Sequence, residues 1–164
     1  KIICSDTSAA RLALAKQLGA DITVDASREN LPDAVTAATG GLGADRTIIC
    51  AGVPSSFHQA IQTTRSCGDV ILVGMIQSQL DFCPMDIFGR DINIISSYTF
   101  TDEIYDAVRS VSQGAIQLGP LISSIYSLSN GQAAFDALAA PGNQELKVIV
   151  DICDGMKGTE KWVK

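Results

Sequence analysis

Short apolar segments alternate with helix-like segments along this chain, and this alternation constrains the fold more than any other feature. Segments in which apolar side chains recur at helical spacing separate most of the apolar runs. Strands joined by helices in this way form parallel βαβ units. The sequence therefore predicts an α/β protein with a doubly wound parallel sheet. The apolar runs that we predict to be strands are residues 1–5, 22–24, 46–52, 67–74, 92–97 and 146–152.

The ends of the predicted helices carry capping signals. Ser8 can cap the first helix, which ends at Gly19 and whose inner face carries Leu12, Ala15 and Leu18. Ser129 and Gln132 form a capping box before the last helix. Further helices are expected at 32–39 and 54–65, and another one after Thr101 that buries Ile104, Val108 and Val111.

The composition excludes several classes of partner. The 164 residues carry a net charge of -6, which disfavours nucleic acid and anionic membranes as partners. No apolar run approaches the ~18 residues that a membrane span needs. Five cysteines without a C-x-x-C pair suit a reducing cytoplasm, where we expect the protein to act. With His58 as its only histidine, the chain is not expected to form a metal site by itself.

Ligands of open parallel sheets bind at the carboxyl ends of the strands, and Asp6 follows the first strand. A carboxylate there can accept both hydroxyl groups of an adenosine ribose and repels a 2′-phosphate, which favours NAD over NADP. Arg11 can lay its guanidinium over the adenine ring. The alternative is that Asp6 only begins a loop and that Arg11 only solvates a helix.

Two glycines, Gly52 and Gly74, each follow an apolar strand. A glycine in this place lets a flat ligand approach the backbone, although an ordinary turn would also explain it. A second glycine group precedes a strand, whereas a pyrophosphate cradle follows one, so we exclude it as a phosphate site. That group consists of Gly40, Gly41 and Gly43.

Five segments, taken in order, resemble one family, the medium-chain, zinc-type alcohol dehydrogenases. In the third segment Cys67 replaces a glycine that is usual in the family, and the fourth segment is most similar to the polyol and threonine dehydrogenase branch. The resemblance covers residues 1–151. The segments are DTSAARLALAKQLGAD, GLGADRTIICAG, CGDVILVG, INIISSYTFTDEIYDAV and LKVIV.

The resemblance implies a Rossmann-like sheet that is incomplete at its N-terminal strand. In the family, the first strand, its G-x-G-x-x-G turn and a catalytic domain with the zinc ligands precede the position of Lys1. We therefore expect a partial dinucleotide-binding domain over 1–98 and C-terminal helices and a strand over 99–151 that pack back on the catalytic domain. Residues 152–164 would form a tail, and the 164-residue chain alone would have negligible activity.

The resemblance also implies a function and a set of cofactor contacts. The whole protein would pass a hydride from a secondary alcohol or polyol to NAD, with zinc held by residues outside this chain. Asp6 would bind the adenosine ribose, and Ser96 stands where the family usually has glycine. The alternatives are a zinc-free quinone or enone reductase of the same superfamily and a non-catalytic nucleotide-binding or interaction module. The remaining implied contacts are Arg11 at the adenine, Ala51 and Gly52 near a ribose, Val73, Gly74, Ser97 and Tyr98 at the nicotinamide, and Lys147 at the pyrophosphate.

The segment Gln79–Cys83 alternates apolar and polar residues, which predicts a short edge strand. An edge strand has unpaired backbone groups that can bind a second copy across a two-fold axis. We therefore expect a homo-oligomer that is joined through Gln79–Cys83. The alternative is that Leu80 and Phe82 only cover the core.

Overall fold

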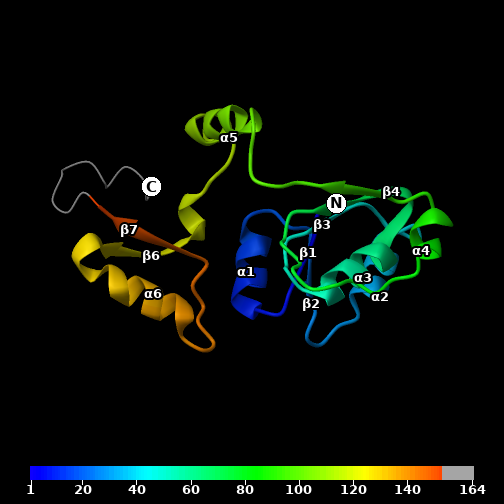
Figure 1. The fold of residues 1–164 in the computed structure, drawn as a ribbon, viewed down its shortest axis with the longest axis horizontal. Coiled ribbons are helices and arrows are strands. Elements are labelled where there is room, and N and C mark those ends of the chain that lie inside the picture. The colour runs from blue at the N-terminus through cyan, green and yellow to red at the C-terminus, as the bar shows by residue number, and fades with distance from the viewer. Residues whose placement is uncertain (153–164) are drawn as a thin grey trace. The chain divides into compact units, whose positions relative to one another are not determined.

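The computed structural model describes residues 1–152 and divides the chain into two compact units, Lys1–Thr101 and a second that begins at Asp102. The strands pair in parallel, as predicted, but they form three separate sheets (Figure 1). Apart from Ile152, the predicted tail lies outside the described residues.

The first unit contains two of the sheets. One pairs β1 with β2, and the other has the order β3-β4-β5. No strand of the described chain lies between β1 and β3, so the two sheets are not joined by backbone hydrogen bonds. The elements are β1 (Ile3–Asp6), α1 (Ala9–Gln17), β2 (Ile22–Asp25), α2 (Leu31–Ala38), β3 (Ala44–Ile49), α3 (Pro54–Thr63), β4 (Thr64–Leu72), α4 (Met85–Phe88) and β5 (Asn93–Ser96).

One face of the three-stranded sheet carries the main core of this unit. Val70 in the central strand is fully buried, and Phe57 and Ile61 of α3 pack on the same face. Ile49, Ala60 and Ile92 complete this cluster. Helix α3 therefore fixes the sheet from one side, and the strand ends stay open for a site.

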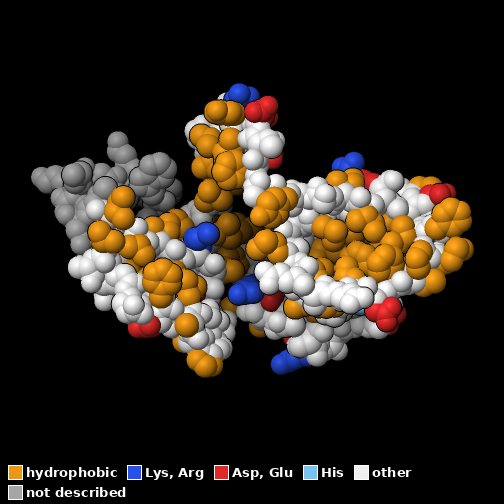
Figure 2. Space-filling view, viewed as in Figure 1, with side chains coloured by type: hydrophobic (Ala, Val, Ile, Leu, Met, Phe, Trp, Pro, Cys, Tyr) orange, Lys and Arg blue, Asp and Glu red, His pale blue; other side chains and the backbone are white. Residues whose placement is uncertain are grey.

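The other face of the same sheet is exposed, which corrects the prediction of a buried strand at 92–97. Ile48, Ile71 and Ile95 stand in one row across β3, β4 and β5. Ile48 is 60% exposed and Ile95 is 46% exposed. Figure 2 shows hydrophobic side chains at the surface of this unit. The apolar sequence of β5 identified the strand correctly but not its burial.

The second unit holds the pair of parallel strands β6 and β7 with α6 against them. The sequence analysis did not predict β6, although it predicted β7 correctly. None of the helices among residues 1–152 combines the length and the hydropathy that crossing a bilayer needs. The elements are α5 (Glu103–Ser112), a 3-10 turn at Gly119–Leu121, β6 (Ile122–Ser127), a 3-10 turn at Leu128–Asn130, α6 (Gly131–Ala139) and β7 (Lys147–Asp151).

Two predicted features of the second unit are wrong. Helix α5 has Asp102 at its N-cap and contains no buried residue, although an inner face of Ile104, Val108 and Val111 was predicted. The predicted capping box also does not form. The Gln132 amide donates to Asp136 at 2.9 Å, and α6 begins after Asn130 without a side-chain cap. An amphipathic pattern identifies a helix, but it does not specify what covers the apolar face.

Two expectations for the first unit also differ from the structure. Gln79–Cys83 forms no strand, and it pairs with no strand among residues 1–152. Leu80 packs against the core, and the ring of Phe82 lies 5.3 Å from that of Phe57. Leu18, which was predicted to face inward from α1, is 45% exposed.

Candidate functional site

Asp6 is the last residue of β1, and the start of α1 holds its carboxylate in place. Asp6 Oδ1 accepts the backbone N–H of Ser8 at 2.8 Å. Ser8 caps α1 as predicted, since its hydroxyl oxygen accepts the N–H of Arg11 at 3.5 Å. Arg11 Nη1 lies 3.7 Å from Asp6 Oδ2, which is too far for a hydrogen bond. In the described part of the chain Oδ2 has no donor closer than this, so it can accept one from a ligand hydroxyl.

A second carboxylate, that of Asp25, lies directly beside Asp6, because the two residues are register partners at the ends of β1 and β2. Ser27 donates to Asp25 Oδ1 through its N–H at 3.0 Å and through its hydroxyl at 2.5 Å. These bonds, with a smaller effect from Arg28, hold the pKa of Asp25 below its ordinary value. The sequence analysis missed this pair, although Asp25 follows its apolar strand just as Asp6 does.

The loops after β3 and β4 contact each other through the two predicted glycines. An added Cβ at Gly52 would lie 2.6 Å from the carbonyl oxygen of Met75, and one at Gly74 would lie 2.6 Å from that of Cys50. The N–H of Gly74 also donates to the carbonyl of Ile49 at 2.7 Å. Glycine is therefore required here by backbone packing.

The carboxyl ends of β3, β4 and β5 lie in adjacent positions, as predicted. Ser97 N–H donates to the carbonyl of Leu72 at 2.9 Å, which sets the chain after β5 beside the end of β4. Tyr98 follows and is 78% exposed. Ala51 and Gly52 follow β3, and Val73 and Gly74 follow β4, so six of the predicted contact residues share one edge of this sheet.

The last predicted contact residue, Lys147, belongs to the second unit and is the first residue of β7. Its carbonyl oxygen accepts the hydroxyl of Ser123 at 3.1 Å. Glu145 precedes it by two residues, and the hydroxyl groups of Ser123 and Ser124 lower the pKa of its carboxyl. Lys147 therefore lies outside the unit that contains the other predicted contact residues.

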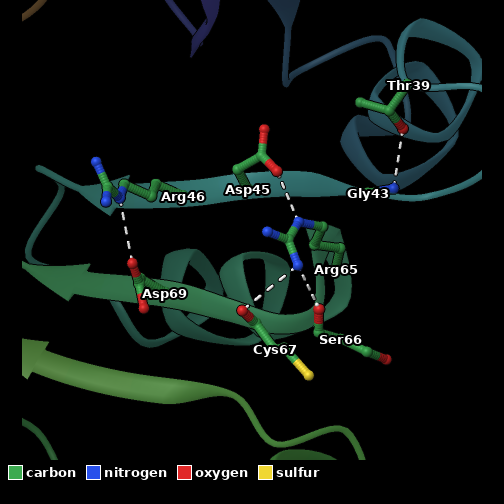
Figure 3. Close-up of polar contacts among 8 residues, drawn as sticks. All are labelled: Thr39, Gly43, Asp45, Arg46, Arg65, Ser66, Cys67 and Asp69. Atoms are coloured by element: carbon green, nitrogen blue, oxygen red, sulfur yellow. Dashed lines mark hydrogen bonds and ion pairs between the residues drawn. The ribbon is translucent and has the colours of Figure 1, made fainter.

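Two charged pairs join β3 to β4 at the opposite end of the sheet (Figure 3), and a neutral amide joins β5 to β4. Arg65 Nε lies 2.6 Å from Asp45 Oδ1, and Arg46 Nε lies 3.2 Å from Asp69 Oδ2. Asn93 donates to the other oxygen of Asp69 at 3.1 Å. The pKa of Asp69 is lowered mainly by Asn93 and then by Arg46. These contacts stabilise strand pairing and leave the carboxyl ends free for a ligand.

One groove of the first unit lies away from the strand ends. Its volume is about 520 Å³, and its lining includes His58, Phe82 and Arg90. Arg90 donates to the backbone carbonyls of Ile61 and Thr64, so its guanidinium is already engaged. Among residues 1–152, no three His, Cys, Asp or Glu side chains come together in a way that could hold a metal ion. The described residues therefore do not fit a zinc site.

Parallel strands with connecting helices and an acidic residue at the end of β1 define a Rossmann-like α/β protein of the dehydrogenase type. The family model described as "Zinc-binding dehydrogenase" matches residues 1–113. The chain belongs to the zinc-binding dehydrogenase family.

Individual relatives agree with this assignment. The chain is 33% identical over 145 residues to D-arabitol-phosphate dehydrogenase of Enterococcus avium, covering 86% of this chain and 40% of that protein. It is 31% identical over 134 residues to L-idonate 5-dehydrogenase (NAD(P)(+)) of Escherichia coli, covering 82% of this chain and 38% of that protein.

Solved structures are similar over nearly the whole chain. The crystal structure of the Escherichia coli L-idonate 5-dehydrogenase matches with a TM-score of 0.82 at 30% identity, covering 93% of this chain and 43% of that one. A Sinorhizobium meliloti protein bound to NADP matches with a TM-score of 0.80 at 29% identity, covering 93% and 45%. The chain thus spans between 38% and 45% of the length of these proteins.

Proposed function

We propose that this chain carries the cofactor-binding residues of an NAD-dependent, zinc-type alcohol or polyol dehydrogenase. The observation that carries the proposal is the position of Asp6. Its carboxylate ends a parallel strand, is held by the Ser8 N–H, and keeps Oδ2 without a hydrogen bond among the described contacts. This is the arrangement that accepts a ribose hydroxyl of an adenine dinucleotide.

Other residues complete the proposed cofactor contacts. Arg11, whose Nη1 lies 3.7 Å from Asp6 Oδ2, would stack on the adenine. Ala51 and Gly52 would lie near a ribose. The backbones of Val73, Gly74, Ser97 and Tyr98 would line the nicotinamide, and their common edge after β4 and β5 supports this. Lys147, in the second unit, would contact the pyrophosphate.

NAD, when bound, accepts a hydride from the carbon of a secondary alcohol. We assign no zinc ligand to this chain, and the metal would be held by residues outside it. The names of the relatives, L-idonate 5-dehydrogenase and D-arabitol-phosphate dehydrogenase, support a polyol or sugar acid as the substrate. We also propose that the protein acts in the cytoplasm, as its cysteine content favours.

We further propose that two copies pair through Gln79–Cys83. The segment is joined to no strand of the described chain, and Gln79 and Asp81 are exposed while Leu80 is anchored to the core. Antiparallel pairing with a second copy would satisfy its backbone groups.

Steady-state kinetics of the protein as it occurs in the cell, called the natural protein below, test the proposal. We expect it to reduce NAD with a panel of sugar alcohols and secondary alcohols and to lose this activity when zinc is chelated. Reduction of quinones or enones with NADPH, without dependence on zinc, would instead support the zinc-free reductase alternative. No turnover with either set of substrates, together with no binding of NAD, would leave only a non-catalytic module.

A further inference from the structure

We propose that Arg28 binds the 2′-phosphate of NADP. The discrimination against NADP is then weaker than Asp6 alone would produce. The inference rests on the proposed function, since it concerns the adenosine end of the same site. Asp6 still sets the preference for NAD. Arg28 limits the size of that preference.

The loop after β2 lies beside Asp6. The N–H of Ala26 donates to the carbonyl of Asp6 at 3.1 Å, and Asp6 and Asp25 are register partners. Neighbouring strands lie about 4.8 Å apart. Residues 25–29 are therefore within reach of a phosphate attached to a hydroxyl group that Asp6 binds.

The backbone of this loop is fixed, whereas the side chain of Arg28 is exposed. The N–H groups of Arg28 and Glu29 both donate to the carbonyl of Asp25, at 3.0 Å and 2.8 Å. The N–H of Asp25 donates to Glu29 Oε1 at 2.9 Å. The side chain of Arg28 is 84% exposed. The backbone of Arg28 is thus held in place, while its exposed side chain can rotate toward a ligand.

Asp25 does not depend on Arg28 for its charge to be stabilised. The two donors of Ser27 bind Asp25 Oδ1, and among the causes that lower the pKa of Asp25 they rank above Arg28. Arg28 approaches Asp25 only through Nε, at 3.5 Å from Oδ2. Its terminal amino groups make no hydrogen bond or ion pair with residues 1–152, and a guanidinium can offer two parallel N–H groups to a phosphate. Moving Arg28 to a phosphate would therefore leave Asp25 satisfied.

Two half-cofactors that differ only in the 2′-phosphate provide the test. Calorimetry on the natural protein would measure the affinities for 5′-AMP and for adenosine 2′,5′-bisphosphate. We expect Arg28→Ala to weaken binding of the bisphosphate about tenfold, as loss of a charged hydrogen-bond partner does, and to leave 5′-AMP unchanged. Arg28→Lys keeps the charge but loses the planar fork. Its affinity for the bisphosphate should lie between that of the wild type and that of Arg28→Ala.

Arg46→Ala is the matched control, because Arg46 also pairs with an aspartate and is also exposed, but in the other sheet of the unit. It should not change the ratio of the two affinities. An unchanged ratio in Arg28→Ala, or an equal loss for both ligands, would overturn the assignment of Arg28. If 5′-AMP binds to none of these proteins, the proposed cofactor site itself is wrong, and the role of Arg28 is rejected with it.

Discussion

Gly74 lies so close to Cys50 that a Cβ added to the glycine would stand 2.6 Å from the carbonyl oxygen of Cys50 and 2.7 Å from its carbonyl carbon. Both atoms belong to the backbone and cannot turn away as a flexible side chain could. The loops that follow β3 and β4 are therefore locked together at the edge where the cofactor is proposed to bind.

Gly74→Ala should destabilise the protein by about 1–3 kcal/mol, because the added methyl group must displace the backbone after β3. Urea unfolding followed by circular dichroism would measure the loss. Gly119→Ala is the matched control, since no atom lies within 4 Å of its Cβ position. Equal stability of the two variants would show that the loops can separate without cost.

Asp69 makes the stability of the β3-β4-β5 sheet sensitive to acid. Its pKa is lowered from 3.8 in the folded chain, chiefly by Asn93. A carboxyl with a lowered folded pKa stabilises the fold above its unfolded pKa, and this stabilisation is lost as the pH falls through the folded value. In Asn93→Ala, the urea concentration at the unfolding midpoint should therefore fall less steeply as the pH is lowered below 3.8. An unchanged slope would contradict this role of the Asp69–Asn93 bond.

Asp81→Pro should prevent pairing of two copies through Gln79–Cys83, because proline removes the N–H that a strand partner would need. Asp81 is exposed, so this change leaves the packing of Leu80 on the core intact. Light scattering would show a smaller particle for Asp81→Pro, whereas Asp81→Ala, which retains the N–H, should match the wild type. A folded Asp81→Pro protein of unchanged size would place the interface elsewhere.

Local signals in the sequence were sufficient for most elements of the first unit. Ser8 identified the start of α1, and the apolar runs identified β1, β2 and β4. The pattern failed at β6, where Ser123 and Ser124 are adjacent and the register with β7 shifts. A bulge breaks the two-residue alternation by which a half-buried strand is recognised.

Burial could not be predicted in the same way, because it depends on which elements meet. Ile95 and Val108 belong to apolar patterns that predicted buried positions, yet 46% and 62% of their surfaces are exposed. The candidate site shows the same limit. Asp6 was found from its place after a strand, but the role of Gly74 in backbone packing depends on Cys50, which is distant in sequence.

The affinity of the natural protein for NAD, measured by calorimetry with changes at Asp6, tests the central claim most directly. Asp6→Asn is the most informative variant, because its amide oxygen can still accept the Ser8 N–H and keep α1 in place. We expect NAD binding to weaken about tenfold through loss of the charged acceptor, and discrimination against NADP to fall. Asp45→Asn, at the opposite end of the other sheet, should change neither value. If NAD affinity and cofactor preference are unchanged in Asp6→Asn, the assignment of the carboxyl end of β1 to the cofactor site is contradicted.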